Sequence, residues 1–154
     1  MENKKFIIFL DVDGVLVSYE RLKERDVDGK QIFVKEAIES LNKIIKYYDA
    51  DLCMISAWNT KFKDNKHYKE FLISRGILVN GLTKGDQGNR YDFVLNEIKE
   101  KELKHYLIID DEAFGYYEMM PTIEYKRILM PNMFRCLDSY DAKRVIFLTK
   151  LNMN

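Results

Sequence analysis

Short apolar runs and amphipathic stretches alternate along this chain. The first run, residues 6–10, places five bulky apolar side chains in succession between charged neighbours, a pattern typical of a strand buried on both faces of a sheet. Runs at residues 52–55 and 106–109 have the same character. Shorter runs at residues 77–79 and 125–130 add two more, so the pattern predicts five strands in all.

Apolar residues at helical spacing occur between these runs. Residues 35–48 carry a single apolar stripe, and similar stripes predict helices over residues 62–75 and 90–101. Ser139 is a suitable cap for a last helix over residues 140–150. Because strands and helices alternate until the last two strands, the order predicts an α/β fold of three layers around a central parallel sheet.

The composition fits one domain that spans residues 1–154, since 47% of the residues are hydrophobic and can supply a core. Lys plus Arg and Asp plus Glu number 25 each, so the net charge argues against strong nonspecific binding to nucleic acid. No apolar run has the length of a membrane span, and the first is too short for a secretory signal. We therefore expect a soluble cytoplasmic protein with no membrane partner.

Polar residues follow three of the predicted strands at the point where each strand ends. These residues are Asp11 and Asp13, Ser56, and the pair Asp110-Asp111. The carboxyl ends of parallel strands meet at one edge of a sheet, so we expect these side chains to converge. Four carboxylates in one place repel each other unless a cation or protons intervene. Hard oxygen ligands without histidine favour Mg²⁺.

The tetrapeptide Asp-Val-Asp-Gly occurs twice, at residues 11–14 and at residues 26–29. Only the first copy follows an apolar strand, whereas the second follows three charged residues. Asp28-Gly29 is a two-residue hairpin signal. We therefore expect the second copy to form a solvated turn in a small hairpin excursion over about residues 15–34.

An acidic cluster with a hydroxyl and a basic residue can transfer a phosphoryl group. One aspartate can attack phosphorus, while a second protonates the leaving oxygen and later activates water. A hydroxyl and a cationic side chain can hold the equatorial oxygens, where charge must be stabilised. The sequence offers Asp11, Asp13 and Ser56 for these tasks, and Lys84 or Arg90 as the cation.

The order of these residues resembles the four motifs of the haloacid dehalogenase (HAD) superfamily over roughly residues 5–112. An apolar run precedes Asp11-x-Asp13-Gly14, a strand precedes Ser56, a basic residue follows, and a strand precedes Asp110-Asp111. The resemblance implies a Rossmann-like fold with five parallel strands and a Mg²⁺-dependent phosphatase that forms an aspartyl-phosphate. Ser56-Ala57-Trp58 and the later Arg90 are also similar to small HAD domains attached to RNA-repair proteins.

The resemblance also assigns roles. Asp11 resembles the nucleophile and a metal ligand, and Asp13 resembles the general acid and base that also binds the metal through its backbone. Ser56 resembles the phosphate-binding hydroxyl, and Asp110 and Asp111 resemble the acidic metal-binding pair. The second aspartate of the first motif is typical of the phosphatases of the superfamily, so Asp13 favours phosphate-ester hydrolysis over carbon–halogen cleavage.

The third motif is less well defined, because two basic residues fit it. Lys84 lies in a predicted loop that contains several glycines, whereas Arg90 begins a predicted helix. A helix start holds a side chain in a fixed position, so Arg90 is favoured as the phosphate ligand and Lys84 is the alternative.

HAD proteins insert cap domains after the first motif or between the second and third. Here the first gap holds only the excursion over residues 15–34, and a helix and a strand use most of the second. The resemblance therefore implies an enzyme without a large cap. An open site suits a large phosphorylated substrate, such as a polynucleotide end or a phosphoprotein. The alternative is a partner subunit in an oligomer that serves as the lid.

Simpler interpretations stay open for several residues. Ser56 is also a suitable helix N-cap, and Asp110-Asp111 is also an ordinary start of a loop. Trp58 fits equally well in a core or in the wall of a substrate site. For the whole protein, the alternative to an enzyme is a non-catalytic phosphate-binding or protein-interaction module on the same fold. The sequence does not separate hydrolysis from phosphoryl transfer to another acceptor.

Overall fold

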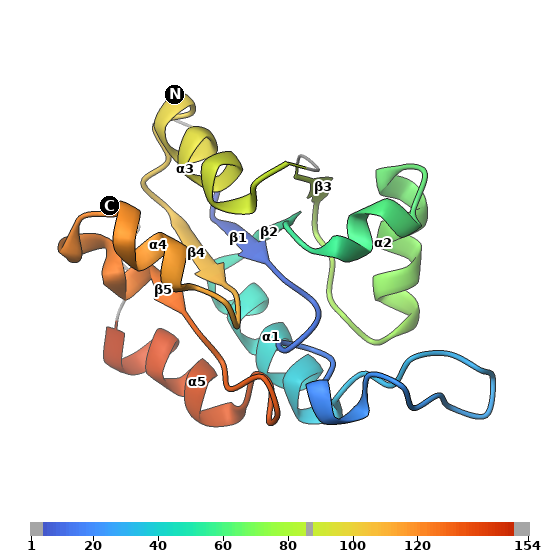
Figure 1. Cartoon of the computed structure of the whole chain (residues 1–154). Helices are drawn as coiled ribbons and strands as arrows, with labels where there is room; N and C mark the ends of the chain where they lie inside the picture. The colour runs from blue at the N-terminus through green and yellow to red at the C-terminus, as the bar shows by residue number, and fades with distance from the viewer. Residues whose placement is uncertain (1–4, 86–87, 150–154) are drawn as a thin grey trace.

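The computed structural model describes residues 5–85 and 88–149 (Figure 1). Across these residues five strands form one parallel sheet of order β3-β2-β1-β4-β5. The strands are β1 (Ile7–Leu10), β2 (Asp51–Met54), β3 (Leu82–Lys84), β4 (Tyr106–Ile109) and β5 (Ile128–Leu129). The expected α/β class with a five-stranded parallel sheet is confirmed, and no cap domain is evident in the described part of the chain.

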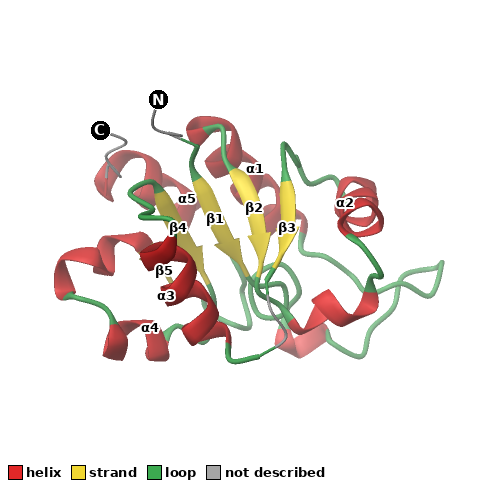
Figure 2. Cartoon of the chain, turned by 90° about the horizontal axis from the view of Figure 1, so that it is seen from above, coloured by secondary structure: helices red, strands yellow, loops and turns green. Residues whose placement is uncertain are grey.

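Helices cover both faces of the sheet, as Figure 2 shows. One face packs against α1 (Lys35–Tyr48) and α5 (Ser139–Lys143), and α2 (Asn65–Ser74) lies beside β3. The other face packs against α3 (Arg90–Glu100) and α4 (Phe114–Met119). No helix among the described residues is long and apolar enough to cross a membrane.

The two faces have separate cores because successive side chains of a strand point to opposite sides. Ile8 and Leu10 of β1 join the core under α1 and α5, whereas Phe9 between them joins the core under α3 and α4. β4 divides in the same way, with Ile109 on the first side and Ile108 on the second. A strand with both faces covered needs apolar residues at every position, which explains the unbroken apolar runs in the sequence.

The third strand lies later in the chain than expected, so the prediction of a strand over residues 77–79 is wrong. Gly76 ends α2 with a positive φ of 89°, and the Asn42 side chain of α1 then bonds the Gly76 carbonyl and the Leu78 N–H. These bonds attach the segment to the middle of α1 rather than to the sheet. Pairing begins only at Leu82, which lies opposite Leu52.

Three other predicted elements have different bounds. A 3-10 helix, η3 (Thr122–Arg127), takes the first half of the expected strand over residues 125–130, and β5 forms in the second half. Another, η2 (Ala57–Lys61), precedes α2, which begins at Asn65 rather than at residue 62. The expected last helix begins with α5 and continues as a π-helical segment, η4 (Arg144–Thr149), while its predicted end at Lys150 lies outside the described residues. Its cap is Asp138, not Ser139.

The excursion between β1 and α1 contains a short 3-10 helix, η1 (Tyr19–Arg21), and a turn with one antiparallel bridge. In this turn Asp26 Oδ1 accepts hydrogen bonds from the N–H groups of Asp28 and Lys30, each at 2.9 Å. Gly29 has a φ of 74° and nothing lies near the position of a Cβ. The second Asp-Val-Asp-Gly is therefore an open turn, remote from the strand ends in Figure 1.

Candidate active site

The sheet brings the predicted acids together because its hydrogen bonding continues one residue past the strands. The N–H of Asp11 donates to the Ile109 carbonyl at 3.0 Å, and the N–H of Asp110 donates to the Leu129 carbonyl at 3.1 Å. Asp11 and Asp110 therefore stand side by side at the carboxyl edge of β1 and β4. Ser56 follows β2, the neighbour of β1 on its other side.

Three buried carboxylates form a compact cluster. Ligand oxygens of Asp11, Asp110 and Asp111 all lie within 4.8 Å of one another. Burial and the neighbouring Asp110 carboxylate raise the pKa of Asp11 to about 9. Burial also raises the pKa of Asp111. Because the cluster resists carrying its full negative charge, it calls for a bound cation or for protons.

Arg90 supplies part of the opposing charge from the first turn of α3. Its Nη1 lies 3.2 Å from Asp11 Oδ2 and 3.2 Å from Asp110 Oδ2. The side chain of Asn89 caps α3 by accepting hydrogen bonds from two backbone N–H groups, which fixes the helix start from which Arg90 projects. Burial disfavours the charged guanidinium, but Asp110 and Asp11 outweigh this effect and raise the pKa of Arg90.

The two acids after β4 have different surroundings. Asp110 is fully buried and has partners for both oxygens: the Arg90 guanidinium, the Glu112 N–H at 2.9 Å and the Tyr116 hydroxyl at 3.4 Å. Asp111 is also buried, yet among the described residues no donor bonds either of its oxygens. A buried carboxylate without partners is costly. Asp111 and the adjacent Asp11 therefore fit a divalent cation, whereas Asp110 is occupied in holding Arg90.

Gly14 allows the chain after β1 to approach Asp111 closely. Its φ is 81°, and a Cβ at this position would lie 2.4 Å from both Cγ and Oδ2 of Asp111. Glycine is required here for two reasons, because other residues rarely adopt this φ and because the carboxylate occupies the space of a side chain.

Asp13 lies outside the group of three possible metal ligands found among the described residues, and its side chain faces Trp58 instead. The indole Nε1 of Trp58 donates to Asp13 Oδ1 at 2.9 Å. Trp58 is only 5% exposed, so it is a core residue that also contacts the site, which combines the two alternatives left open by the sequence.

The structure separates the two candidate basic residues. Lys84 ends β3, not a loop, and its Nζ donates to the Phe62 carbonyl at 2.8 Å, while Arg90 contacts the acids directly. Ser56 is buried and caps η2, with its Oγ accepting from the Trp58 N–H at 3.1 Å. A hydroxyl that accepts one hydrogen bond can still donate its own hydrogen, so the cap does not prevent contact with a phosphate.

Tyr19 is a site residue that the sequence did not reveal. Its ring lies within 2.8 Å of the position that a Cβ of Gly14 would take, and burial together with Asp111 raises the pKa of its hydroxyl to about 12. Its N–H donates to the Met133 carbonyl at 3.1 Å, and the Ser18 hydroxyl donates to the Phe134 carbonyl. The loop after β5 therefore adjoins the site, a contact between segments more than 100 residues apart that no local signal predicts.

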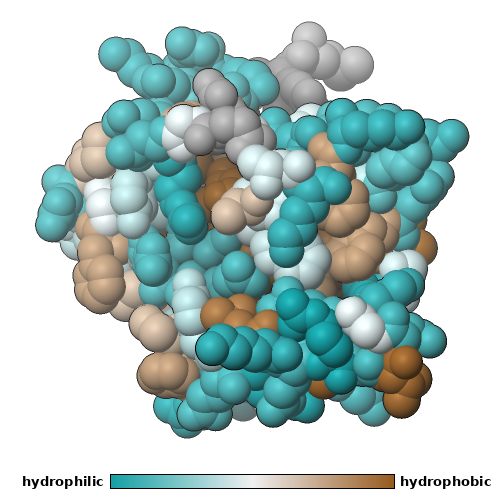
Figure 3. Space-filling model, turned by 45° about the vertical axis from the view of Figure 1, so that its right-hand side comes forward, coloured by the Kyte–Doolittle hydropathy of each residue, from teal (hydrophilic) through white to brown (hydrophobic). Residues whose placement is uncertain are grey.

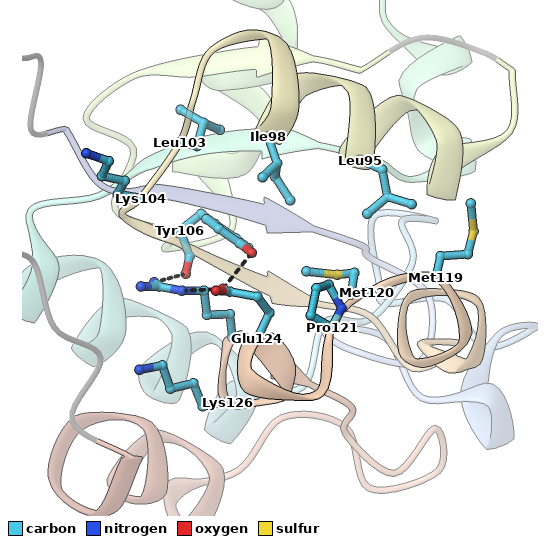
Figure 4. A pocket seen from close by; sticks show the side chains of 11 residues that line it. Leu95, Ile98, Leu103, Lys104, Tyr106, Met119, Met120, Pro121, Glu124 and Lys126 are labelled. Atoms are coloured by element: carbon cyan, nitrogen blue, oxygen red, sulfur yellow. Dashed lines mark hydrogen bonds and ion pairs between the residues drawn. The ribbon is translucent and has the colours of Figure 1, made fainter.

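A groove of about 500 Å³ lies elsewhere, between α3 and the segment that follows α4 (Figure 4). Its polar groups bond one another, since Glu124 accepts from the Arg127 Nε at 2.9 Å and from the Tyr106 hydroxyl at 3.0 Å. Tyr106 begins β4, whereas Asp110 follows its end. The groove is therefore separate from the acidic cluster.

Comparison with known proteins supports one assignment. No curated protein and no solved structure matches the chain. A family model described as the HAD domain in Swiss Army Knife RNA repair proteins matches residues 7–131, a segment that contains the five strands described above, the acidic cluster and Asp13. The chain therefore belongs to the HAD superfamily, in the family of HAD domains found in Swiss Army Knife RNA repair proteins.

Proposed function

We propose that this protein is a Mg²⁺-dependent phosphohydrolase that acts through an aspartyl-phosphate, with a phosphorylated polynucleotide end as substrate. The observation that carries the proposal is the acidic cluster itself. Asp11 lies beside Arg90 and clusters with Asp111, which no donor among the described residues bonds, and Ser56 follows the next strand. Superfamily membership supports phosphoryl chemistry at this edge.

In the first step an oxygen of Asp11 attacks phosphorus, and the bond from phosphorus to the leaving oxygen breaks. Asp13 gives its proton to that oxygen. In the second step Asp13 takes a proton from water, and the water oxygen attacks phosphorus. Inorganic phosphate leaves and the Asp11 carboxylate is restored. Arg90 and the Ser56 hydroxyl hold the equatorial oxygens of the phosphoryl group, where negative charge accumulates.

The raised pKa of Asp11 supports a role for a cation, because a nucleophilic carboxylate must be ionised. Mg²⁺ bound by Asp11 and Asp111 would supply the positive charge that keeps Asp11 ionised and that neutralises the phosphate. Arg90 alone leaves the three acids with a net negative charge. The Asp13 side chain is free of this duty and is available as the acid.

The rim of the site supports a substrate with planar rings. Tyr19, Met133 and Phe134 are 36%, 37% and 51% exposed. Tyr19 lies beside Asp111, and the loop with Met133 and Phe134 is bonded to Tyr19 and to the neighbouring Ser18. Exposed aromatic side chains next to a phosphate site suit unstacked nucleobases. On the face shown in Figure 3 hydrophilic residues predominate, and hydrophobic residues gather in several places.

The test compares hydrolysis by the wild-type protein, Asp11→Asn and the control Asp26→Asn. Substrates are an aryl phosphate, oligoribonucleotides with a 3′- or 5′-terminal phosphate, and a phosphopeptide, each with MgCl₂ or EDTA. We expect Asp11→Asn to lose activity by about 10³-fold or more. Asp26 holds the equivalent place in the second tetrapeptide, so its variant should stay active. Equal activity in Asp11→Asn and the wild type would exclude Asp11 as the nucleophile. Faster hydrolysis of the phosphopeptide than of the oligoribonucleotides would exclude a polynucleotide end as the substrate.

A further inference from the structure

Trp58 is the one tryptophan of the chain, and its N–H is directed at the proposed acid. It lies in η2, two residues after Ser56, and reaches across to the loop after β1. The hydrogen bond from Nε1 to Asp13 Oδ1 is 2.9 Å long and joins residues 45 positions apart. Because Trp58 is 5% exposed, water competes little for this bond.

Packing around the indole leaves its ring little freedom. Phe33 meets Trp58 edge to face, with ring centroids 5.5 Å apart, and Phe71 of α2 lies at 5.6 Å. The Lys61 ammonium is 3.8 Å from the ring centroid, a cation–π contact. The direction of the N–H is therefore set by the end of the excursion, by α2 and by η2 together.

We propose that Trp58 is the positioning residue that presents Asp13 to the leaving group. The indole N–H can only donate, so Oδ1 accepts this bond and Oδ2 is the oxygen left to face the leaving group. The bond thereby fixes both the rotation of the carboxyl group and the oxygen that exchanges the proton. This inference rests on the proposed role of Asp13 as the general acid.

Substrates with different leaving groups show whether a substitution of Trp58 acts through the general acid Asp13. An alkyl phosphate releases a basic alkoxide that needs a proton, whereas nitrophenyl phosphate releases a stable phenolate that does not. We expect Trp58→Phe, which keeps a ring and removes the N–H, to lower kcat about tenfold on the alkyl ester. On nitrophenyl phosphate the loss should be less than about threefold. A general loss of structure would lower both rates alike.

A double-mutant cycle with Asp13→Asn supplies the coupling. If Trp58 acts through Asp13, then Trp58→Phe has no further effect on the alkyl ester once Asp13 is Asn. Equal losses on both esters, or independent effects of the two substitutions, would overturn the proposal.

A measurement without turnover separates this proposal from the proposed function. The single indole N–H gives one resonance in a ¹⁵N-labelled sample. We expect it to move upfield in Asp13→Ala, which removes the acceptor, and to stay in place in Asp28→Ala, its counterpart in the second tetrapeptide. An unmoved resonance in Asp13→Ala would overturn the positioning role. If the indole resonance shifts in Asp13→Ala but the wild-type protein hydrolyses neither ester, the proposed function is wrong and the contact between Trp58 and Asp13 is confirmed.

Discussion

Two glycines in identical tetrapeptides offer a matched test of the site. Gly14 and Gly29 have similar positive φ values, 81° and 74°. Alanine at either position costs roughly 1–2 kcal/mol for the left-handed backbone. Among the described residues, a Cβ at Gly14 would lie 2.4 Å from Asp111, whereas nothing lies within 4 Å of a Cβ at Gly29.

In Gly14→Ala the Asp111 carboxylate must withdraw by about 1 Å to reach an ordinary contact of roughly 3.5 Å. Such overpacking adds about 1–3 kcal/mol to the loss of stability. A misplacement of this size in a catalytic group costs about 10²-fold in rate. We therefore expect Gly14→Ala to lose about 2–5 kcal/mol and about 10²-fold in activity, and Gly29→Ala to lose only about 1–2 kcal/mol and to stay active.

The assay is urea unfolding of both variants with EDTA and with MgCl₂, together with hydrolysis of an aryl phosphate under conditions where each is folded. Mg²⁺ should stabilise Gly29→Ala as much as the wild type, and Gly14→Ala less. If the two variants show equal stability, equal Mg²⁺ response and equal activity, then the close approach of Gly14 to Asp111 does not determine the metal site.

Two further predictions concern charge. Arg90→Met should lower activity about 10²-fold or more, because it removes the cation beside Asp11. Lys84→Met should change activity less than about threefold, because Lys84 bonds the Phe62 carbonyl instead. Equal losses in steady-state assays would contradict the choice of Arg90 over Lys84 as the phosphate ligand. The pKa of Asp11 is about 9 in the metal-free folded protein against an ordinary 3.8, so the stability that its proton supplies is complete below pH 4 and disappears as the pH rises towards 9. The midpoint temperature of unfolding in EDTA should therefore fall as the pH rises over this range, and the stabilisation by MgCl₂ should grow. If the stabilisation by MgCl₂ is independent of pH, Mg²⁺ does not displace protons from the cluster.

The placement of the acids could be predicted from the sequence because it depends on local pattern. An unbroken apolar run predicts a strand with both faces covered, and a parallel sheet brings the ends of such strands to one edge. The positions of Asp11, Asp110 and Ser56 follow from this pattern alone. The second Asp-Val-Asp-Gly shows the limit of a motif without this context, since Asp26 uses its carboxylate to close a turn.

The third strand could not be placed in the same way. Residues 77–79 and 82–84 are both short, and apolar content favours the first. The choice depends on the Asn42 side chain, which bonds the earlier segment to α1. A hydrogen bond between residues more than 30 positions apart leaves no mark in a local window.

The sequence by itself determined the α/β class, the parallel sheet and the edge at which the acids meet, because strand periodicity and strand ends are local properties. Only the tertiary structure decided how those acids divide their partners: Asp110 with Arg90, Asp13 with Trp58, and Asp111 with no donor among the described residues. These pairings depend on where separate helices pack on the sheet and on the few ångströms between side chains. The physical reason is that burial and distance determine charge and hydrogen bonding, and both are properties of the folded chain.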